Sequence, residues 1–391
     1  GDARFTSSIG VGTTPSGVAG QISGTTALLT GTPSIYATLF SVYLPSTSSR
    51  LIYVNNGVTN FGYLAGVSSG VQSTSLGYQA GQTLTGVQNT CVGYQAGTGA
   101  STFDTNALTA VGYRAGYATT SRLHNTIIGS LAGQSVTSGW QNTLVGAYAG
   151  QAINIGYYNT AVGYRSQYLG TSPYWCTAVG YYALYTNTSG WNLTAVGSYA
   201  GFSANGSTAL TAVGYQAGYN STGGNCTYLG YNAGFNSTGS DCTYVGCAAG
   251  QRLTSGTQNT CVGSQAGYGA STYTAGDLTA IGFKAGYAIS TGTGNTLLGS
   301  QAGVAISSGS SNVAVGYQAL NANTTFGSSV AIGYQALYTN NASDNLTAVG
   351  YQAGYSMNTA TSHFTAVGYQ ILTTAGQLAQ LRRTGLDEYG V

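Results

Sequence analysis

The sequence predicts an all-β protein built as one long stack of short parallel strands, and three observations predict it. An octet of the form Thr-Ala-Val-Gly-Tyr-Gln-Ala-Gly recurs with a mean period of 17 between residues 59 and 372, and a fixed period is the signature of a solenoid. Charged residues make up only 4% of the chain, against about 25% in an average protein. The residues before each central glycine also have the polarity and shape of a strand.

The central glycines of the octets define the coils. Nineteen copies align on them, which predicts a β-solenoid of about 19 coils and, at the spacing of paired strands, a rod of roughly 85 Å. The central glycines are Gly62, Gly77, Gly93, Gly112, Gly129, Gly146, Gly163, Gly180, Gly197, Gly214, Gly230, Gly246, Gly263, Gly282, Gly299, Gly316, Gly333, Gly350 and Gly368.

Positions are numbered here from the central glycine of each coil. Position −1 is apolar in all nineteen copies, and position −3 is Thr in seventeen and Val in two. Because these positions are two apart, their side chains share one face of the strand, which we expect to point inward. Val213→Asp should then prevent folding, whereas Gln216→Glu should be tolerated. The predicted repeat core includes Val111, Val162, Val213, Val315 and Ile332.

Position −2 lies on the opposite face and is mostly Ala, with large apolar residues such as Ile127, Leu144 and Tyr228 in other copies. A strand that is apolar on both faces is typically buried on both faces. A single solenoid covers only one of them, so further copies of the same chain are the simplest cover for the other.

The repeat divides the chain into three parts. Residues 1–57 hold three of the four prolines and are expected to form an irregular β lead-in that caps the first coil. Residues 58–372 form the repeat. Residues 373–391, which contain a short segment at 377–383 compatible with one or two helical turns, are expected to be a polar cap or the start of a further domain.

Part of the repeat is itself repeated. Residues 88–133 and 258–303 are identical at 27 of 46 positions and lie 170 residues, or ten coils, apart. A block duplication explains this spacing, and selection for length tolerates it better than selection for one unique pocket.

The sequence argues against an enzyme, a cofactor and a metal site. The two histidines, His124 and His363, lie fourteen coils apart, and the seven acidic residues are scattered, so no convergent titratable group is expected. The glycines match no phosphate-binding motif, and no Cys/His spacing suggests zinc. A net charge of +2 gives no reason to expect nucleic acid, and no apolar run approaches the roughly 20 residues of a membrane span.

Two residue sets remain as candidate sites. Tyr follows the central glycine in twelve copies, and exposed members such as Tyr215, Tyr231, Tyr317 and Tyr334 could bind sugar rings. The alternative, which we favour, is that these rings close the corner of each coil and pack between chains. Cys226 and Cys242 occupy one position in adjacent coils, within disulfide range, although free thiols in an apolar ladder are the simpler interpretation.

The repeat resembles the head of the trimeric autotransporter adhesins, the YadA-like family. Residues 329–333, Ser-Val-Ala-Ile-Gly, and 312–316, Asn-Val-Ala-Val-Gly, match that family's core motif. The Asn-Thr-Ala-Val-Gly-Tyr form at 159–164 and the lead-in at 8–22 look more like segments of bacteriophage tail fibres. The resemblance covers about four fifths of the chain and implies a left-handed parallel β-roll that assembles as a homotrimer. The period of 17 is longer than usual for the family, so the turns should bulge.

Function follows from this resemblance as an expectation. We expect a structural and adhesive fibre protein, a bacteriophage tail fibre or spike segment of the virion that attaches to a host cell-surface glycan or protein receptor. The alternative is a bacterial trimeric surface adhesin head on the cell surface. A third interpretation, an ice-binding or extracellular filament, is disfavoured if the Thr row points inward.

Overall fold

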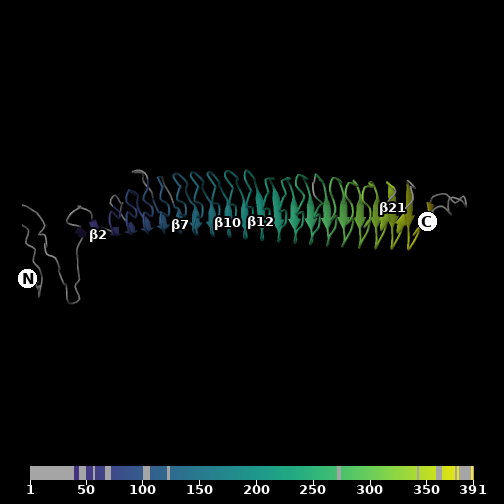
Figure 1. The fold of residues 1–391 in the computed structure, drawn as a ribbon, viewed down its shortest axis with the longest axis horizontal. Coiled ribbons are helices and arrows are strands. Elements are labelled where there is room, and N and C mark those ends of the chain that lie inside the picture. Colours follow the sequence, from purple (N-terminus) through teal and green to yellow (C-terminus); the bar gives the residue numbers. More distant parts are fainter. Residues whose placement is uncertain are drawn as a thin grey trace, which may run out of the picture.

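A computed structural model shows a parallel β-solenoid, drawn out as a rod (Figure 1). The structure describes residues 39–43, 50–55, 58–66, 72–99, 106–120, 124–270, 274–340, 343–357, 363–374, 377 and 389–390. The lead-in motif at 8–22 and nearly all of the segment at 377–383 therefore lie outside the described residues. Within the described part, every named element is a strand.

A short strand ends directly before each of the nineteen central glycines. These strands are β3 (Val58–Phe61), β4 (Thr74–Leu76), β5 (Thr90–Val92), β6 (Thr109–Val111), β7 (Thr126–Ile128), β8 (Thr143–Val145), β9 (Thr160–Val162), β10 (Thr177–Val179), β11 (Thr194–Val196), β12 (Leu210–Val213), β13 (Cys226–Leu229), β14 (Thr243–Val245), β15 (Thr260–Val262), β16 (Thr279–Ile281), β17 (Thr296–Leu298), β18 (Val313–Val315), β19 (Val330–Ile332), β21 (Leu346–Val349) and β23 (Phe364–Val367).

The strands pair in parallel and in register, so that each coil lies on its counterpart. In β10 and β11, for example, Thr177 pairs with Thr194 and Val179 pairs with Val196. This register holds from β3 to β23. The sequence repeat thus becomes a repeat in space, and the side chains of one position form a column along the rod. The predicted stacked architecture is confirmed in this coarse form.

The predicted inward face of the strand is wrong. Positions −2 and −4 point into the coil and are buried, as Ala212 and Leu210 are in β12, whereas Thr211 and Val213 lie on the outer side. The predicted core residues Val111, Val162, Val213 and Val315 are only half-buried, and Ile332 is exposed. The reason is space, because the narrow coil interior has room for Ala on most rungs and for a larger side chain only on some.

The coil interior also contains a polar column. At position −4, Asn142 donates its Nδ2 proton to the carbonyl of Gly156 at 2.8 Å and accepts the backbone N–H of Asn159 at 3.0 Å. Asn125, Asn259, Asn295 and Asn312 are buried at the same position in other coils. Such bonds satisfy the backbone groups of the loop that the strands leave unpaired.

The central glycine is required by its neighbour in the next coil. At Gly214 the backbone φ is +131°, and an added Cβ would lie 2.5 Å from the carbonyl oxygen of Gly230. This conformation is open to glycine and rarely adopted by other residues. The glycine column therefore allows the close approach of successive coils at the corner that follows each strand.

Both ends of the sheet are covered by additional strands. β1 (Leu39–Tyr43) pairs antiparallel with β2 (Arg50–Asn55), which pairs antiparallel with β3. β24 (Tyr389–Gly390) pairs in parallel with β23 at the other end. A two-stranded pairing joins β20 (Thr339–Asn340) to β22 (Ser356–Met357). Covered edges limit the exposure of unpaired backbone groups.

Candidate functional site

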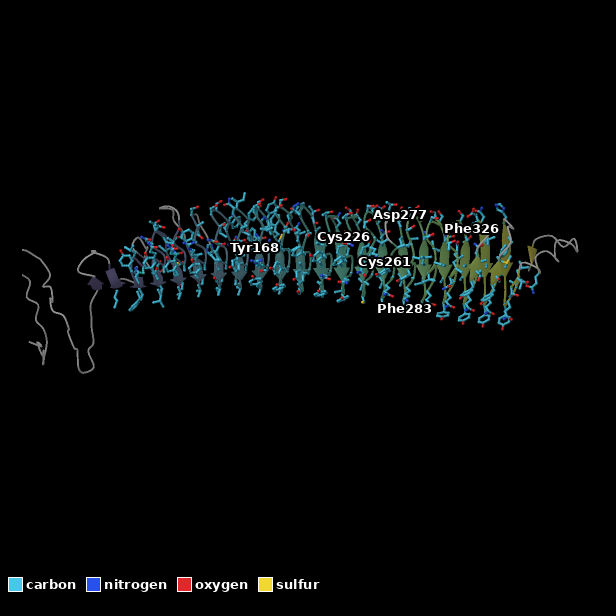
Figure 2. The ribbon with its side chains drawn as sticks, viewed as in Figure 1. Tyr168, Cys226, Cys261, Asp277, Phe283 and Phe326 are labelled. Atoms are coloured by element: carbon cyan, nitrogen blue, oxygen red, sulfur yellow. The ribbon has the colours of Figure 1, made fainter. Side chains whose placement is uncertain are left out.

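The tyrosines at position +1 form an exposed column along the rod. Tyr215 and Tyr231 stack with ring centroids 5.4 Å apart, and Tyr317 and Tyr334 stack at 5.3 Å. All four side chains are exposed. Phe283, which occupies the same position, projects from the lower edge of the rod in Figure 2, on the far side from Asp277 at the upper edge.

The stacking limits what this column can bind. Rings at 5.1 to 5.5 Å with nearly parallel planes cover one another's faces, so a ligand meets mainly ring edges and hydroxyl groups. Sugar rings use the flat apolar face of an aromatic residue. The geometry of Tyr215, Tyr231, Tyr317 and Tyr334 therefore suits stacking along the fibre better than stacking on a sugar.

A second aromatic column lies at position +5. It includes a continuous stack from Tyr168 through Tyr185, Phe202 and Tyr219 to Phe235, with centroids 4.7 to 5.2 Å apart. The Arg165 guanidinium lies beside this column, 5.1 to 5.7 Å from the ring centroids of Tyr148, Tyr164, Tyr168 and Tyr182, and donates to the Tyr182 hydroxyl at 2.8 Å. Cation–π contacts of this kind hold the cation in place, so Arg165 stabilises the column internally.

The cysteine pair is buried in the coil interior. Cys226 and Cys242 follow one another at position −4, and their thiols hydrogen-bond to backbone carbonyls, Cys226 to Gly239 at 3.3 Å and Cys242 to Gly256 at 3.5 Å. All six cysteines are free, and of these only Cys247 is exposed.

Burial keeps the thiols of Cys91 and Cys176 in their neutral form. It raises the pKa of Cys91 to about 12 and that of Cys176 to about 11. In the Cys226–Cys242 pair, the hydrogen bond between the two side chains lowers the pKa of Cys226 and raises that of Cys242. Because the thiolate is the reactive form, Cys91 and Cys176 act as small apolar core groups and not as nucleophiles.

The described residues contain no cluster of three or more His, Cys, Asp or Glu side chains that could hold a metal ion. These residues also form no helix with the length and apolarity of a membrane span.

Sequence reasoning missed the aromatic column at position +5 and one further cluster. A third aromatic column stands at position −6, in the loop before the strand, and includes Trp140, Tyr157, Tyr174 and Trp191. The signal available in the sequence was that all three tryptophans of the chain, Trp140, Trp175 and Trp191, fall within four consecutive coils.

Comparison with known proteins adds no relative. No family model matches the chain, and no curated protein or solved structure is significantly similar to it. The fold and the exposed surfaces must therefore carry the functional argument.

Proposed function

We propose that the chain is the shaft of a homotrimeric attachment fibre, a bacteriophage tail fibre or spike segment that presents or forms a receptor-binding surface. The observation that carries the proposal is the outer face of the strands. Position −1 is apolar in every coil, and its side chains are exposed or half-buried from Phe61 and Leu76 to Val367. A continuous exposed apolar surface of this length marks an interface.

The repeat makes such an interface self-complementary. Similar side chains recur in parallel register, an apolar residue at position −1 and Thr or Val at position −3 of each coil, so a neighbouring copy meets the same spacing along the whole rod. Closed rotational symmetry is the usual way in which identical chains bury such a surface. Three left-handed coils packed side by side, as the resemblance to the trimeric adhesins implies, would cover position −1 and the neighbouring Thr column.

The mechanism is passive. Rigidity comes from columns of hydrogen-bonded backbone and stacked rings, and three identical chains multiply the strength of each weak contact with the host surface. The alternative role, the head of a bacterial trimeric adhesin, uses the same assembly. The two roles differ in what the chain is attached to, a virion or a bacterial outer membrane, so the flanking genes distinguish them.

A second candidate function is ice binding, which one observation favours. The Thr column at position −3, expected to point inward, lies on the outer side of the strand, as Thr211 and Thr227 do. A flat, regular row of Thr methyl and hydroxyl groups is the surface such proteins use. Measuring the thermal hysteresis of a solution of the purified chain tests this role. A solution that shows no thermal hysteresis would exclude it.

Light scattering at several protein concentrations tests the fibre proposal. We expect a particle of three chains of 39.5 kDa each that resists dissociation in moderate urea. A monodisperse monomer that unfolds cooperatively on its own would refute the trimer and the interface at position −1.

A further inference from the structure

A compact aromatic cluster occupies the loop edge of the rod between residues 140 and 192. Its base is the column at position −6, in which Trp140 and Tyr157 stack at 5.2 Å and Tyr157 and Tyr174 stack at 5.2 Å. Isolated parallel bridges join Tyr157 to Tyr174 and Tyr174 to Trp191. The backbone pairing fixes the spacing of these rings, so the cluster is preorganised.

Two further rings rest on this base at position −5. Tyr158 and Trp175 are parallel to each other within 12°, with centroids 6.4 Å apart. Both rings are turned steeply against the base. Trp175 makes angles of 85° with Tyr157 and 89° with Tyr174. Tyr158 makes angles of 76° with Tyr157 and 64° with Trp140. We call these two rings, on their base of Trp140, Tyr157, Tyr174 and Trp191, the loop-edge platform.

The spacing of the two upper rings affects how much of their faces is open. The base rings stack at 5.2 Å. Tyr158 and Trp175 are also nearly parallel, but at 6.4 Å they are too far apart to cover one another's faces as closely as the base rings do. Tyr158 is 42% exposed and Trp175 is 50% exposed. The platform therefore leaves more of its ring faces open than the tyrosine column at position +1, where the rings stack at 5.1 to 5.5 Å.

The chain itself shows that the fold does not require these rings. Ten coils later, the residues that correspond to Tyr158 and Trp175 are Ser328 and Asn345. All four have positive φ, between 53° and 59°. This left-handed conformation suits Asn well and a bulky residue poorly. Two aromatic residues at these positions carry a conformational cost that coil stacking alone does not explain.

The surroundings of the platform indicate the chemistry of its ligand. Exposed amides, Gln141 and Asn192, occupy position −5 on the rungs before and after the two rings, and each offers both donors and an acceptor. Arg165 is the single formal charge between residues 126 and 240, and it is enclosed by tyrosine rings at position +2. Aromatic faces flanked by neutral hydrogen-bonding groups suit a hydroxylated, uncharged ligand.

We propose that the loop-edge platform binds a neutral glycan, with a sugar ring stacked on Tyr158 and Trp175 and its hydroxyls bonded to Gln141 and Asn192. The proposal rests on the attachment role and specifies its receptor chemistry. It also places the binding surface on the opposite edge of the coil from position +1, as Asp277 at position −5 and Phe283 at position +1 show in Figure 2.

The test is binding of the full chain to an array of neutral and anionic glycans. A double variant, Tyr158→Ser with Trp175→Asn, takes the residues that the chain uses at Ser328 and Asn345 and should fold normally. The matched control, Tyr317→Ser with Tyr334→Ser, removes rings from the exposed column on the other edge. We expect wild type and control to bind at least one neutral glycan, and the double variant to bind it at least tenfold more weakly.

A second readout localises the ligand. Because all three tryptophans lie in the platform, titration with the neutral oligosaccharide found on the array should change the intrinsic fluorescence. Absence of any neutral ligand, binding of anionic glycans alone, or full binding by the double variant would overturn the proposal. Light scattering on the same samples keeps the two proposals separate, since the double variant should keep the mass of wild type whatever it binds.

Discussion

Ala212 and Val213 are consecutive residues of β12 whose side chains lie on opposite sides of the strand. Ala212 is completely buried in the coil interior, whereas Val213 is half-buried on the outer face. Ala212→Asp would place an unpaired carboxylate in that interior and should prevent the coil from folding. Val213→Asp should leave the coil folded and weaken association between chains, which replaces the expectation from sequence that it prevents folding.

The two variants are compared by circular dichroism and light scattering. A Val213→Asp protein that keeps its β signal but loses mass supports the outer interface. Equal loss of β structure in both variants would show that the two faces are not distinguished in this way.

The central glycines permit a matched test of coil-to-coil packing. Gly180 and Gly368 have the same φ of +138°, but a Cβ on Gly180 would collide with the carbonyl of Gly197, whereas a Cβ on Gly368 meets nothing within 4 Å. Gly368→Ala should cost the backbone strain alone, about 1–3 kcal/mol. Gly180→Ala should cost clearly more, and thermal unfolding of the two variants measures the difference. If the two variants lose the same stability, the glycine is required by its positive φ and not by contact with the next coil.

The buried asparagine column should contribute measurably to stability. Asn142→Ala removes an acceptor for the Asn159 N–H and a donor to the Gly156 carbonyl, and each buried group left unpaired costs about 1–3 kcal/mol. Cys176→Ala, at the same position two coils later, loses only weak thiol bonds and serves as the control. Urea unfolding should rank Asn142→Ala as the more destabilised; the reverse order would contradict a structural role for the column.

Alkaline pH should destabilise the chain through its buried thiols. The pKa of Cys91 is about 12 in the fold, against an ordinary value of 9.0. Above pH 9 the unfolded chain loses this proton while the folded chain keeps it, so the stability falls by about 1.4 kcal/mol per pH unit until about pH 12. Below pH 9 this contribution is constant.

The variant Cys91→Ala tests this dependence, since Ala occupies the same position in most coils. Its stability, measured by urea unfolding at several values between pH 8 and 11, should fall less steeply than that of wild type. Cys247→Ser, which changes an exposed thiol, should follow wild type. A Cys91→Ala slope equal to that of wild type would refute the contribution of this group.

The sequence predicted the parallel stack because its period determines which residues meet between coils, as the pairing of Thr177 with Thr194 shows. It did not predict the buried face, because Val213 and Ala212 are both apolar and periodicity cannot rank them. Size variation was the missing signal. The residue at position −2 varies in size from coil to coil, from Ala161 to larger residues such as Leu144 and Tyr228. Such variation is typical of a core that is filled differently in each coil. The residues at position −1 vary less in size. The loop-edge platform was missed because its rings lie in the turn segment, where the repeat is weakest.

Thiol labelling gives a direct count of the accessible cysteines. In the described structure all six cysteines are free, and five are buried while Cys247 is exposed at position +1. Ellman's reagent should therefore label one thiol per chain in the native protein and six after unfolding without reductant, and Cys247→Ser should reduce the native count to zero. Four thiols after unfolding would instead indicate a disulfide, for which Cys226 and Cys242 are the adjacent pair. Rapid labelling of more than one thiol in the native protein would mean that the coils open readily and expose buried cysteines. This result would contradict a rigid shaft whose coils stay folded.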